Sequence, residues 1–250
     1  KPTIAAINAA LLDTLAACGD VNRNVMSTTL PAQRAVHAEA LGLARTISAH
    51  LLPKSGAYHE IWLDGEKLVD TAEADEPVYG RTYLPRKFKI GVAVPPDNDV
   101  DVYSQDLGFI ALVEDGRITG YQVVVGGGMG VTHGDPATWP RVADALGVCA
   151  PDDALAVAEA VVTTQRDHGD RRNRKHARLK YTVEDMGLDA FRAEVERRAG
   201  VRFARASPAR FASATTATPR RAGTSTTKAT GTTCSTPRPG ESAMTAPGAR

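Results

Sequence analysis

Hydrophobic residues recur with two different periods along the first 205 residues. Near the start, four of them fall on one face of a helix that we expect to end at Gly19: Ile4, Ile7, Leu11 and Leu15. The same helical period predicts four further helices, over residues 32–52, 139–146, 152–166 and 188–199. These helices lie before and after a central region that has a different period.

The central region alternates hydrophobic and polar residues, as strands do. Strands are predicted over residues 59–63, 67–69, 88–94, 108–113 and 118–125. Turn residues join two pairs of them into hairpins, through Asp64-Gly65 and through Glu114-Asp115-Gly116-Arg117. Hairpins with helices on either side predict an α+β fold, with a mixed or antiparallel sheet flanked by helices, rather than a parallel doubly wound sheet.

The predicted strand over residues 88–94 has two unlike faces. The buried face would carry four hydrophobic side chains: Phe88, Ile90, Val92 and Val94. Lys87 and Lys89 would project together from the opposite face, with their ammonium groups roughly 7 Å apart. Gly91 continues that face without a side chain and leaves room for a flat ligand. The pattern fits an anion site, and it also fits an ordinary solvated strand face.

Composition and charge add few constraints. The chain has 42% hydrophobic residues and a formal net charge of +1, so its overall charge predicts no partner. Cys18, Cys149 and Cys234 are scattered singly, which favours free thiols in a reducing cytoplasm. His133 and His176 also lack the spacing of metal ligands, so no metal site is predicted. No apolar run has membrane-spanning length.

Three further segments could bind an anion. Arg23, in a polar loop expected after the first helix, could present a planar guanidinium to an oxyanion. Glycines within residues 126–130 follow a strand and would let backbone N–H groups approach a bulky or anionic ligand, but their spacing is not the dinucleotide fingerprint. Six of the ten residues in 171–180 are Lys or Arg, which suits phosphates or a polycarboxylate. Because only Tyr181 could stack on a base there, nucleic acid is the weaker expectation, and a solvated charged loop is the other alternative.

These segments resemble one family in the same order along the chain. The matching stretches are CGDVNRNVM (18–26), AYHEIWLDGE (57–66), YGRTYLPRKFKIG (79–91), DVYSQDLGFIALVEDGRITGY (101–121), VGGGMGVTHG (125–134) and DRRNRKHARLKYTVED (170–185). On them the chain resembles the siroheme sulfite and nitrite reductases, and within these the hemoprotein (beta) subunit of assimilatory sulfite reductase. The resemblance extends from Thr3 to about Phe203. Residues 58–63 and 101–109 are similar to the NADPH-linked bacterial branch rather than to the ferredoxin-linked one.

The resemblance implies the central siroheme-binding domain of that fold, and a six-electron reduction of sulfite to sulfide at siroheme coupled to a four-iron cluster. By motif match, three residues would bind the anion and supply protons: Arg23, Lys87 and Lys89. Siroheme carries eight carboxylates, and the residues that would lie against it are Arg86, Gly127, Gly128, Lys175 and Arg178. The implied partners are sulfite and an electron donor, either an NADPH-linked flavoprotein or ferredoxin. Neither a membrane nor nucleic acid is an expected partner.

The chain also departs from the family pattern. Family members contribute four cysteines in two close pairs from a C-terminal half, and this chain has no such pair. Because a four-iron cluster needs four converging thiolates, we expect that this chain alone neither holds the cluster nor transfers electrons. Residues 1–205 would then be an incomplete hemoprotein domain, about the first of two similar halves. Nitrite reductase, and a noncatalytic module for polyanions or nucleic acid, stay open as alternatives.

The character of the sequence changes at about residue 206. Of the 45 residues from there to Arg250, 16 are Ser or Thr and the only aromatic one is Phe211. Such a segment cannot bury enough apolar surface to offset its conformational entropy, so a disordered tail is predicted over residues 206–250. Since family members continue past the position of Phe203 with another strand-rich segment, a shifted reading frame is a further hypothesis. A natural flexible linker is its alternative.

Overall fold

The computed structural model describes residues 19–28, 35–54, 76–206 and 211, together with the backbone of residues 60–63 and 66–70. The chain divides into two units, Lys1–Ser213 and Ala214–Arg250, and every described residue belongs to the first. The predicted helix that ends at Gly19, and the predicted tail apart from Ala206 and Phe211, lie outside the described residues. The strands are β1 Asn22–Ser27, β2 Glu60–Leu63, β3 Glu66–Asp70, β4 Phe88–Ala93, β5 Leu107–Glu114, β6 Arg117–Val125 and β7 Asp144–Cys149. The helices are α2 Ala35–His50, α3 Ala154–His168, α4 Leu179–Met186 and α5 Leu188–Ala199, with 3₁₀ turns η1 Val102–Ser104, η2 Pro151–Asp153 and η3 Arg174–His176.

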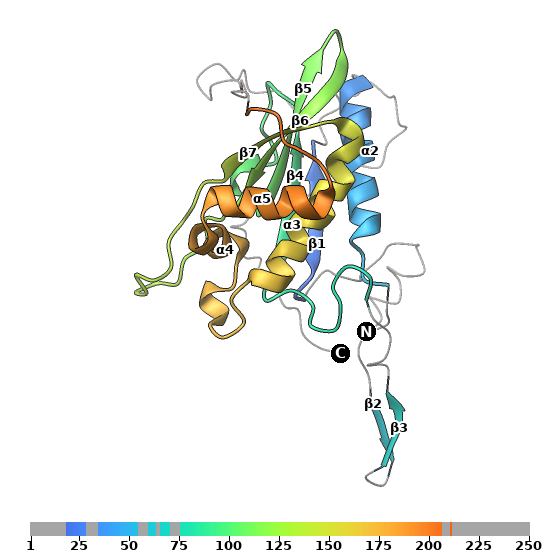
Figure 1. The fold of residues 1–250 in the computed structure, drawn as a ribbon, viewed down its shortest axis with the longest axis vertical. Coiled ribbons are helices and arrows are strands. Elements are labelled where there is room, and N and C mark those ends of the chain that lie inside the picture. Colours follow the sequence, from blue (N-terminus) through green and yellow to red (C-terminus); the bar gives the residue numbers. More distant parts are fainter. Residues whose placement is uncertain are drawn as a thin grey trace, which may run out of the picture. The chain divides into compact units, whose positions relative to one another are not determined.

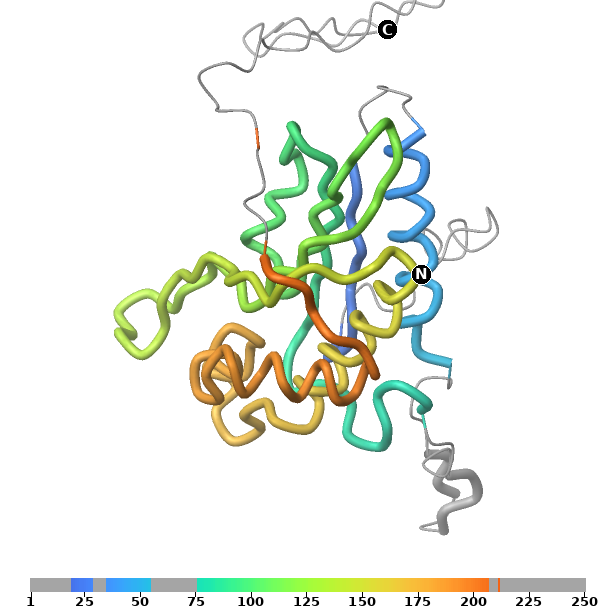
Figure 2. The backbone as a smooth tube through the Cα atoms, turned by 45° about the horizontal axis from the view of Figure 1, so that its top comes forward, coloured from blue at the N-terminus to red at the C-terminus, as the bar shows by residue number. Residues whose placement is uncertain are grey.

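A five-stranded mixed sheet with the order β1-β4-β5-β6-β7 forms the centre of the fold. The pairs β1–β4 and β4–β5 are parallel, whereas β5–β6 and β6–β7 are antiparallel. Helices α2, α3 and α5 lie across one face of this sheet (Figures 1 and 2). Strands β2 and β3 form a separate antiparallel pair. The α+β fold with a mixed sheet flanked by helices is therefore confirmed.

The two faces of the sheet carry different hydrophobic clusters. The larger cluster joins the helices to side chains of every strand of this sheet, and the smaller one is covered by Val100, Val102 and Tyr103 around η1. On β4 the side chains of Ile90 and Val92 enter the larger cluster, while Ala93 enters the smaller one. The predicted alternation along this strand is therefore confirmed.

Phe211 packs against the smaller cluster. Its ring meets Tyr103 edge to face, with 5.9 Å between ring centroids. The chain reaches this face after Ala204, which exchanges two backbone hydrogen bonds with Val148 on β7. One residue of the predicted tail thus contacts the sheet.

Several predicted elements match the structure closely. Helix α5 has the predicted bounds, and Gly200 ends it in the left-handed conformation with φ of 70°. The β5–β6 turn places Asp115 and Gly116 at φ of 48° and 76°, as a two-residue hairpin turn of type I′ requires. The helices predicted over 32–52 and 152–166 correspond to α2 and α3, and the strands predicted over 59–63, 67–69, 108–113 and 118–125 correspond to β2, β3, β5 and β6.

The helix predicted over residues 139–146 was wrong. The chain is extended there and enters β7 at Asp144. Ala143 and Ala145 face the smaller cluster while Leu146 faces the larger one, a period of two that the short hydrophobic run did not distinguish from a helical one. Strand β1 was predicted as a loop because polar residues occupy most of it, and α4 was not predicted.

Candidate anion-binding site

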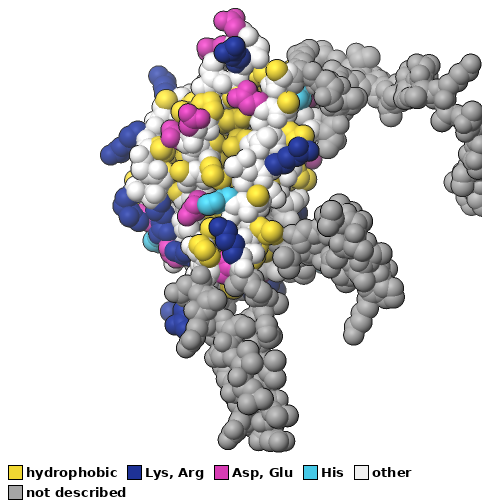
Figure 3. Space-filling model, turned by 90° about the vertical axis from the view of Figure 1, so that its right-hand side faces the viewer, with side chains coloured by type: hydrophobic (Ala, Val, Ile, Leu, Met, Phe, Trp, Pro, Cys, Tyr) yellow, Lys and Arg dark blue, Asp and Glu magenta, His cyan; other side chains and the backbone are white. Residues whose placement is uncertain are grey.

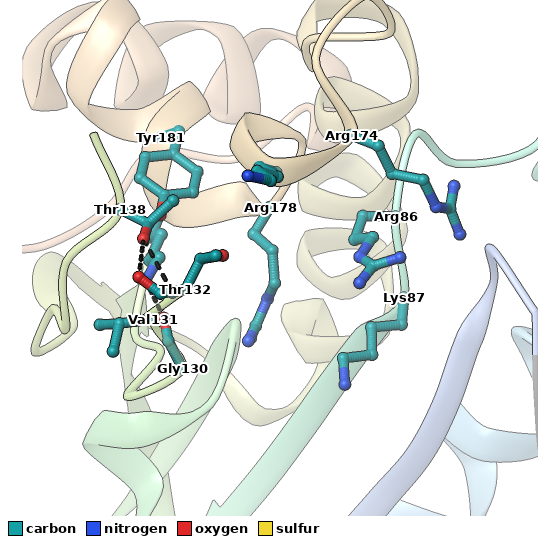
Figure 4. A pocket seen from close by; sticks show the side chains of 11 residues that line it. Arg86, Lys87, Gly130, Val131, Thr132, Thr138, Arg174, Arg178 and Tyr181 are labelled. Carbon is teal, nitrogen blue, oxygen red and sulfur yellow. Dashed lines mark hydrogen bonds between the residues drawn. The ribbon is translucent and has the colours of Figure 1, made fainter. Parts of the chain in front are cut away.

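A cavity of about 410 Å³ opens where β4 begins, beside the first turn of α4. One wall is formed by Arg86 and Lys87, just before β4, and the opposite wall by residues 130–132 and Thr138. The segment around η3 and the start of α4 adds Arg174, Lys175, Arg178, Lys180 and Tyr181. Figure 4 shows the side chains of Arg86, Lys87 and Arg178 pointing into the same space. Four of the eight predicted site residues therefore line one cavity.

Positive charge is concentrated around Lys87. Burial lowers the pKa of the Lys87 ammonium, and four neighbouring cations lower it further: Lys89, Arg178, Arg23 and Arg86. In the described part of the chain, the charged groups that contribute most to this shift are therefore all cations. Among the described residues, Arg86, Lys87 and Lys89 make no side-chain hydrogen bond or ion pair, and we call these three the β4 cations. The structure thus brings the three predicted anion-binding residues, Arg23, Lys87 and Lys89, close enough together for their charges to interact.

Arg23 lies near Lys87 because the pairing of β1 with β4 is irregular. Asn22 pairs with Phe88 and Asn24 pairs with Lys89, so Arg23 is the extra residue of a β-bulge. A bulge redirects the side chain of the extra residue, which an undisturbed strand would hold in strict alternation. The Nε of Arg23 donates to the Gly19 carbonyl oxygen at 3.0 Å, and this bond orients the guanidinium.

Asp106 connects β4 to Arg178. Its side chain has no solvent exposure; one oxygen accepts from Arg178 Nη2 at 2.7 Å and the other from the Lys89 backbone N–H at 3.0 Å. Burial raises the pKa of this carboxyl, and Arg178 together with the Lys89 N–H opposes that change. Arg178 is therefore held in place by a buried ion pair, with part of its positive charge already balanced.

The basic segment 171–180, which we call the 171–180 cluster, is largely neutralised within the protein. Arg174 makes a two-pronged ion pair with Asp20, at 2.8 and 3.0 Å, and Lys175 Nζ lies 3.2 Å from an oxygen of Asp135. Arg171 donates to backbone oxygens of residues 82, 83 and 166. Among the six Lys and Arg residues of this cluster, all of which are described, only Arg172 makes no side-chain hydrogen bond or ion pair. Most of this charge stabilises loops.

The glycines of the site pack against the protein's own chain. A Cβ at Gly91 would lie 3.1 Å from the Gln105 side chain and 3.6 Å from Val100, so the space predicted above Gly91 is filled by the chain and that prediction was wrong. A Cβ at Gly127 would collide with the carbonyl oxygens of Tyr103 and Gln105. One at Gly128 would lie 3.3 Å from the Arg178 guanidinium. Close backbone packing therefore explains Gly127, and its predicted contact with a ligand stays a prediction.

The described residues contain no group of three His, Cys, Asp or Glu side chains that could hold a metal ion. Cys149 is buried on β7, where desolvation raises the pKa of its thiol to about 12, so it stays protonated. Cys18 and Cys234 lie outside the described residues. His133 is exposed, and His176 stacks on Tyr181 with 3.8 Å between ring centroids.

None of the described helices combines the length and hydropathy of a bilayer-spanning segment.

Residues 42–203 match the family model described as the nitrite and sulphite reductase 4Fe-4S domain. The chain belongs to this family. Among curated relatives, it is 59% identical over 211 residues to the sulfite reductase [NADPH] hemoprotein beta-component of Geobacillus kaustophilus, and 63% identical over 212 residues to that of Methylorubrum extorquens. Each alignment covers 83% of this chain but only 37% and 34% of the relative, so the chain spans about a third of these proteins.

The fold is also similar to a solved structure, that of the Mycobacterium tuberculosis NirA protein. The TM-score is 0.56 at 23% sequence identity, over 77% of this chain and 30% of that one. At this identity the likeness concerns the fold alone. It agrees with the fold that the sequence motifs imply for a family member.

Sequence reasoning missed two residues that shape the site. Asp106 stands alone before a strand, and no spacing in the sequence relates it to Arg178, 72 positions away. Lys180 was counted among the anion-binding charges, whereas its side chain is buried and donates only to backbone carbonyls. A lysine within the hydrophobic period of a short helix, beside Leu179 and Val183, is the one sequence signal that could have identified it.

Proposed function

We propose that this chain forms the sulfite- and siroheme-binding part of a sulfite reductase hemoprotein of the NADPH-linked type. The observation that supports this most strongly is the concentration of cations around Lys87, beside a cavity lined by further cations. Motif similarity to hemoprotein beta-components extends over the same residues. In this proposal residues 1–205 act as one incomplete hemoprotein domain.

Arg23, Lys87 and Lys89 would hold the sulfite anion. The repulsion between their charges is relieved when an anion lies among them, and donors preorganised in this way stabilise a sulfur oxyanion as it gains electrons. Because burial and neighbouring cations lower the pKa of Lys87, its ammonium is a stronger acid than a free lysine and suits proton donation to an S–O bond that breaks.

Arg86, Lys175 and Arg178 would pair with carboxylates of siroheme, and Gly127 and Gly128 would lie beside the macrocycle. The residues present fit such a group, since the cavity walls supply cations and the arginines can pair with carboxylates in two-pronged geometry. Lys175 would exchange Asp135 for a ligand carboxylate, because that ion pair is exposed and weak. When bound, siroheme supplies the iron at which sulfite is reduced.

A four-iron cluster does not fit the described residues. Such a cluster needs four converging thiolates, and the whole chain has three cysteines, of which Cys149 is buried and protonated. We therefore propose that the cluster, and electron transfer from the flavoprotein component or ferredoxin, require parts that this chain does not supply. Reconstitution of the chain with iron and sulfide tests this: four-iron absorbance with sulfite-dependent turnover would contradict it.

Titration of the chain with siroheme, followed by visible absorbance, tests the binding role. The double variant Lys87→Met/Lys89→Met should bind siroheme at least about tenfold more weakly, since two unpartnered cations are lost. Lys54→Met is the control, because Lys54 is exposed and does not line the cavity. If the chain instead binds nucleic acid with a steep salt dependence, and siroheme not at all, it is a polyanion-binding module.

A further inference from the structure

Residues 128–141 form an arm that projects from the sheet between β6 and β7 (Figures 1 and 2). Two backbone hydrogen bonds between Gly128 and Arg141, at 2.8 and 3.0 Å, close its base. A second turn follows further out, where the Thr132 N–H donates to Thr138 Oγ1 at 2.8 Å. Beyond Arg141 the chain enters β7. The arm supplies the cavity wall opposite Arg86 and Lys87, so its position sets the width of the site.

Lys180 reaches this arm from the first turn of α4. Its Nζ donates to the carbonyl oxygens of Gly128 at 3.2 Å, Gly130 at 2.9 Å and Trp139. Lys180 has 1% exposure, although it extends along the cavity wall. An ammonium has three protons, and three carbonyl groups of the arm accept them. The charge of Lys180 is therefore fully engaged with the arm and is not available to a ligand.

Aromatic rings complete the contact between arm and α4. Trp139 meets the Tyr181 ring edge to face at 5.1 Å, and His176 stacks on the other side of Tyr181 at 3.8 Å. Lys180 Nζ lies 4.9 Å from the centre of the Tyr181 ring. Figure 4 shows Tyr181 beside the Thr132–Thr138 turn. The arm is thus held on the side of its base by two neighbouring residues of one helix.

We infer that Lys180 is a positioning residue: its ammonium fixes the arm against α4 and so places the wall formed by Gly130, Val131 and Thr132. Only an ammonium on a stem of this length satisfies three carbonyls at once. A neutral side chain of equal length would leave all three without a donor in a buried place, and the arm would detach. The consequence for a bound tetrapyrrole rests on the function proposed above, whereas the consequence for the arm does not.

Amide hydrogen exchange of the full chain tests the position of the arm directly. In Lys180→Met the amides of Gly128, Thr132 and Arg141 should exchange at least tenfold faster, while those of β5 and β6 keep their rates. Lys54→Met, an exposed lysine outside the cavity, should change none of them. Unchanged exchange in Lys180→Met would overturn the inference.

Chemical rescue separates the ammonium from the packing of its stem. Lys180→Ala lacks the atoms of n-propylamine, so n-propylammonium should restore slow exchange of the arm amides and n-propanol should not. If Lys180→Ala does not fold, the amide exchange of Lys180→Met by itself decides whether Lys180 positions the arm. Equal rescue by the alcohol would overturn the role of the charge.

Siroheme affinity then measures the effect on the site. Lys180→Met should bind siroheme about tenfold more weakly than the unsubstituted chain, and n-propylammonium should restore the affinity of Lys180→Ala. An unchanged affinity in Lys180→Met would show that the arm does not position the wall for this ligand. Absence of siroheme binding in the unsubstituted chain would count against the proposed function, while the exchange measurements would still decide the role of Lys180.

Discussion

The β4 cations and the 171–180 cluster are both strongly basic, but they differ in what surrounds the charge. In the cluster, Arg174 faces Asp20, Lys175 faces Asp135 and Lys180 faces three carbonyls. Beside Lys87 the neighbours that affect its pKa are themselves cations. On the face shown in Figure 3, Lys and Arg side chains are likewise interspersed with Asp and Glu. A count of basic residues would select the cluster, whereas the β4 cations are the ones that make no side-chain hydrogen bond or ion pair among the described residues.

The electrostatic repulsion among the β4 cations shows why the difference between the two regions matters. Two like charges about 7 Å apart repel by roughly 2 kcal/mol at an effective dielectric constant of 20. A folded protein keeps such an arrangement only if packing elsewhere offsets the repulsion, and a bound anion converts it into attraction. The paired charges of the cluster stabilise the chain without a ligand, whereas under the proposed function the β4 cations would stabilise it only with a bound anion.

The largest expected effect comes from the buried ion pair between Asp106 and Arg178, which links β4 to the 171–180 cluster. Asp106→Asn leaves the Arg178 guanidinium without a carboxylate in a place with little solvent, so we expect a loss of about 3 kcal/mol in the free energy of unfolding. Urea denaturation measures it. Asp135→Asn breaks the exposed Lys175 pair in the same way and should cost less than about 1 kcal/mol. Equal losses in the two variants would show that burial does not distinguish them.

Sequence patterns predicted most of the fold, because the hydrophobic face of β4, the I′ turn of β5–β6 and the capped helix α5 are local features. They failed where a tertiary contact overrides the local pattern. Strand β1 is polar and forms because β4 offers it a parallel edge, and β7 is stabilised by pairing with β6 and Ala204. For the site, the sequence motifs indicated which cations lie close together. Partners that are distant in sequence, such as Asp106 for Arg178, could not be inferred from spacing.

An intermediate effect is expected for paired charges in acid. Ion pairs and hydrogen bonds with Arg197 and Arg198 lower the pKa of Glu194 from 4.5 to about 2. Its ionised form is therefore favoured by folding, and the resulting stability, present above pH 4.5, is lost as the pH falls towards 2. Glu194→Gln should be less stable than the unsubstituted chain by about 1 kcal/mol at neutral pH, with the difference vanishing near pH 2. Glu114→Gln, at the exposed end of β5, is the control for acid unfolding curves.

The smallest expected effect concerns the β4 cations. Here the substitution should raise the stability of the chain, whereas the substitutions above should lower it. Because the pKa of Lys87 lies below 10.5 in the folded protein, its charged form is disfavoured by folding. The penalty is complete at neutral pH and is relieved as the pH rises through the lowered pKa towards 10.5, so stability increases in this window. Lys87→Met should therefore be more stable than the unsubstituted chain by a few tenths of a kcal/mol at pH 7, since water screens the repulsion, and the advantage should disappear above pH 10.5. Thermal unfolding of both proteins across this range measures the difference, with Lys54→Met as the control. A Lys87→Met variant less stable at pH 7 would mean that Lys87 already has a stabilising partner, and the contrast between the two basic regions would fail.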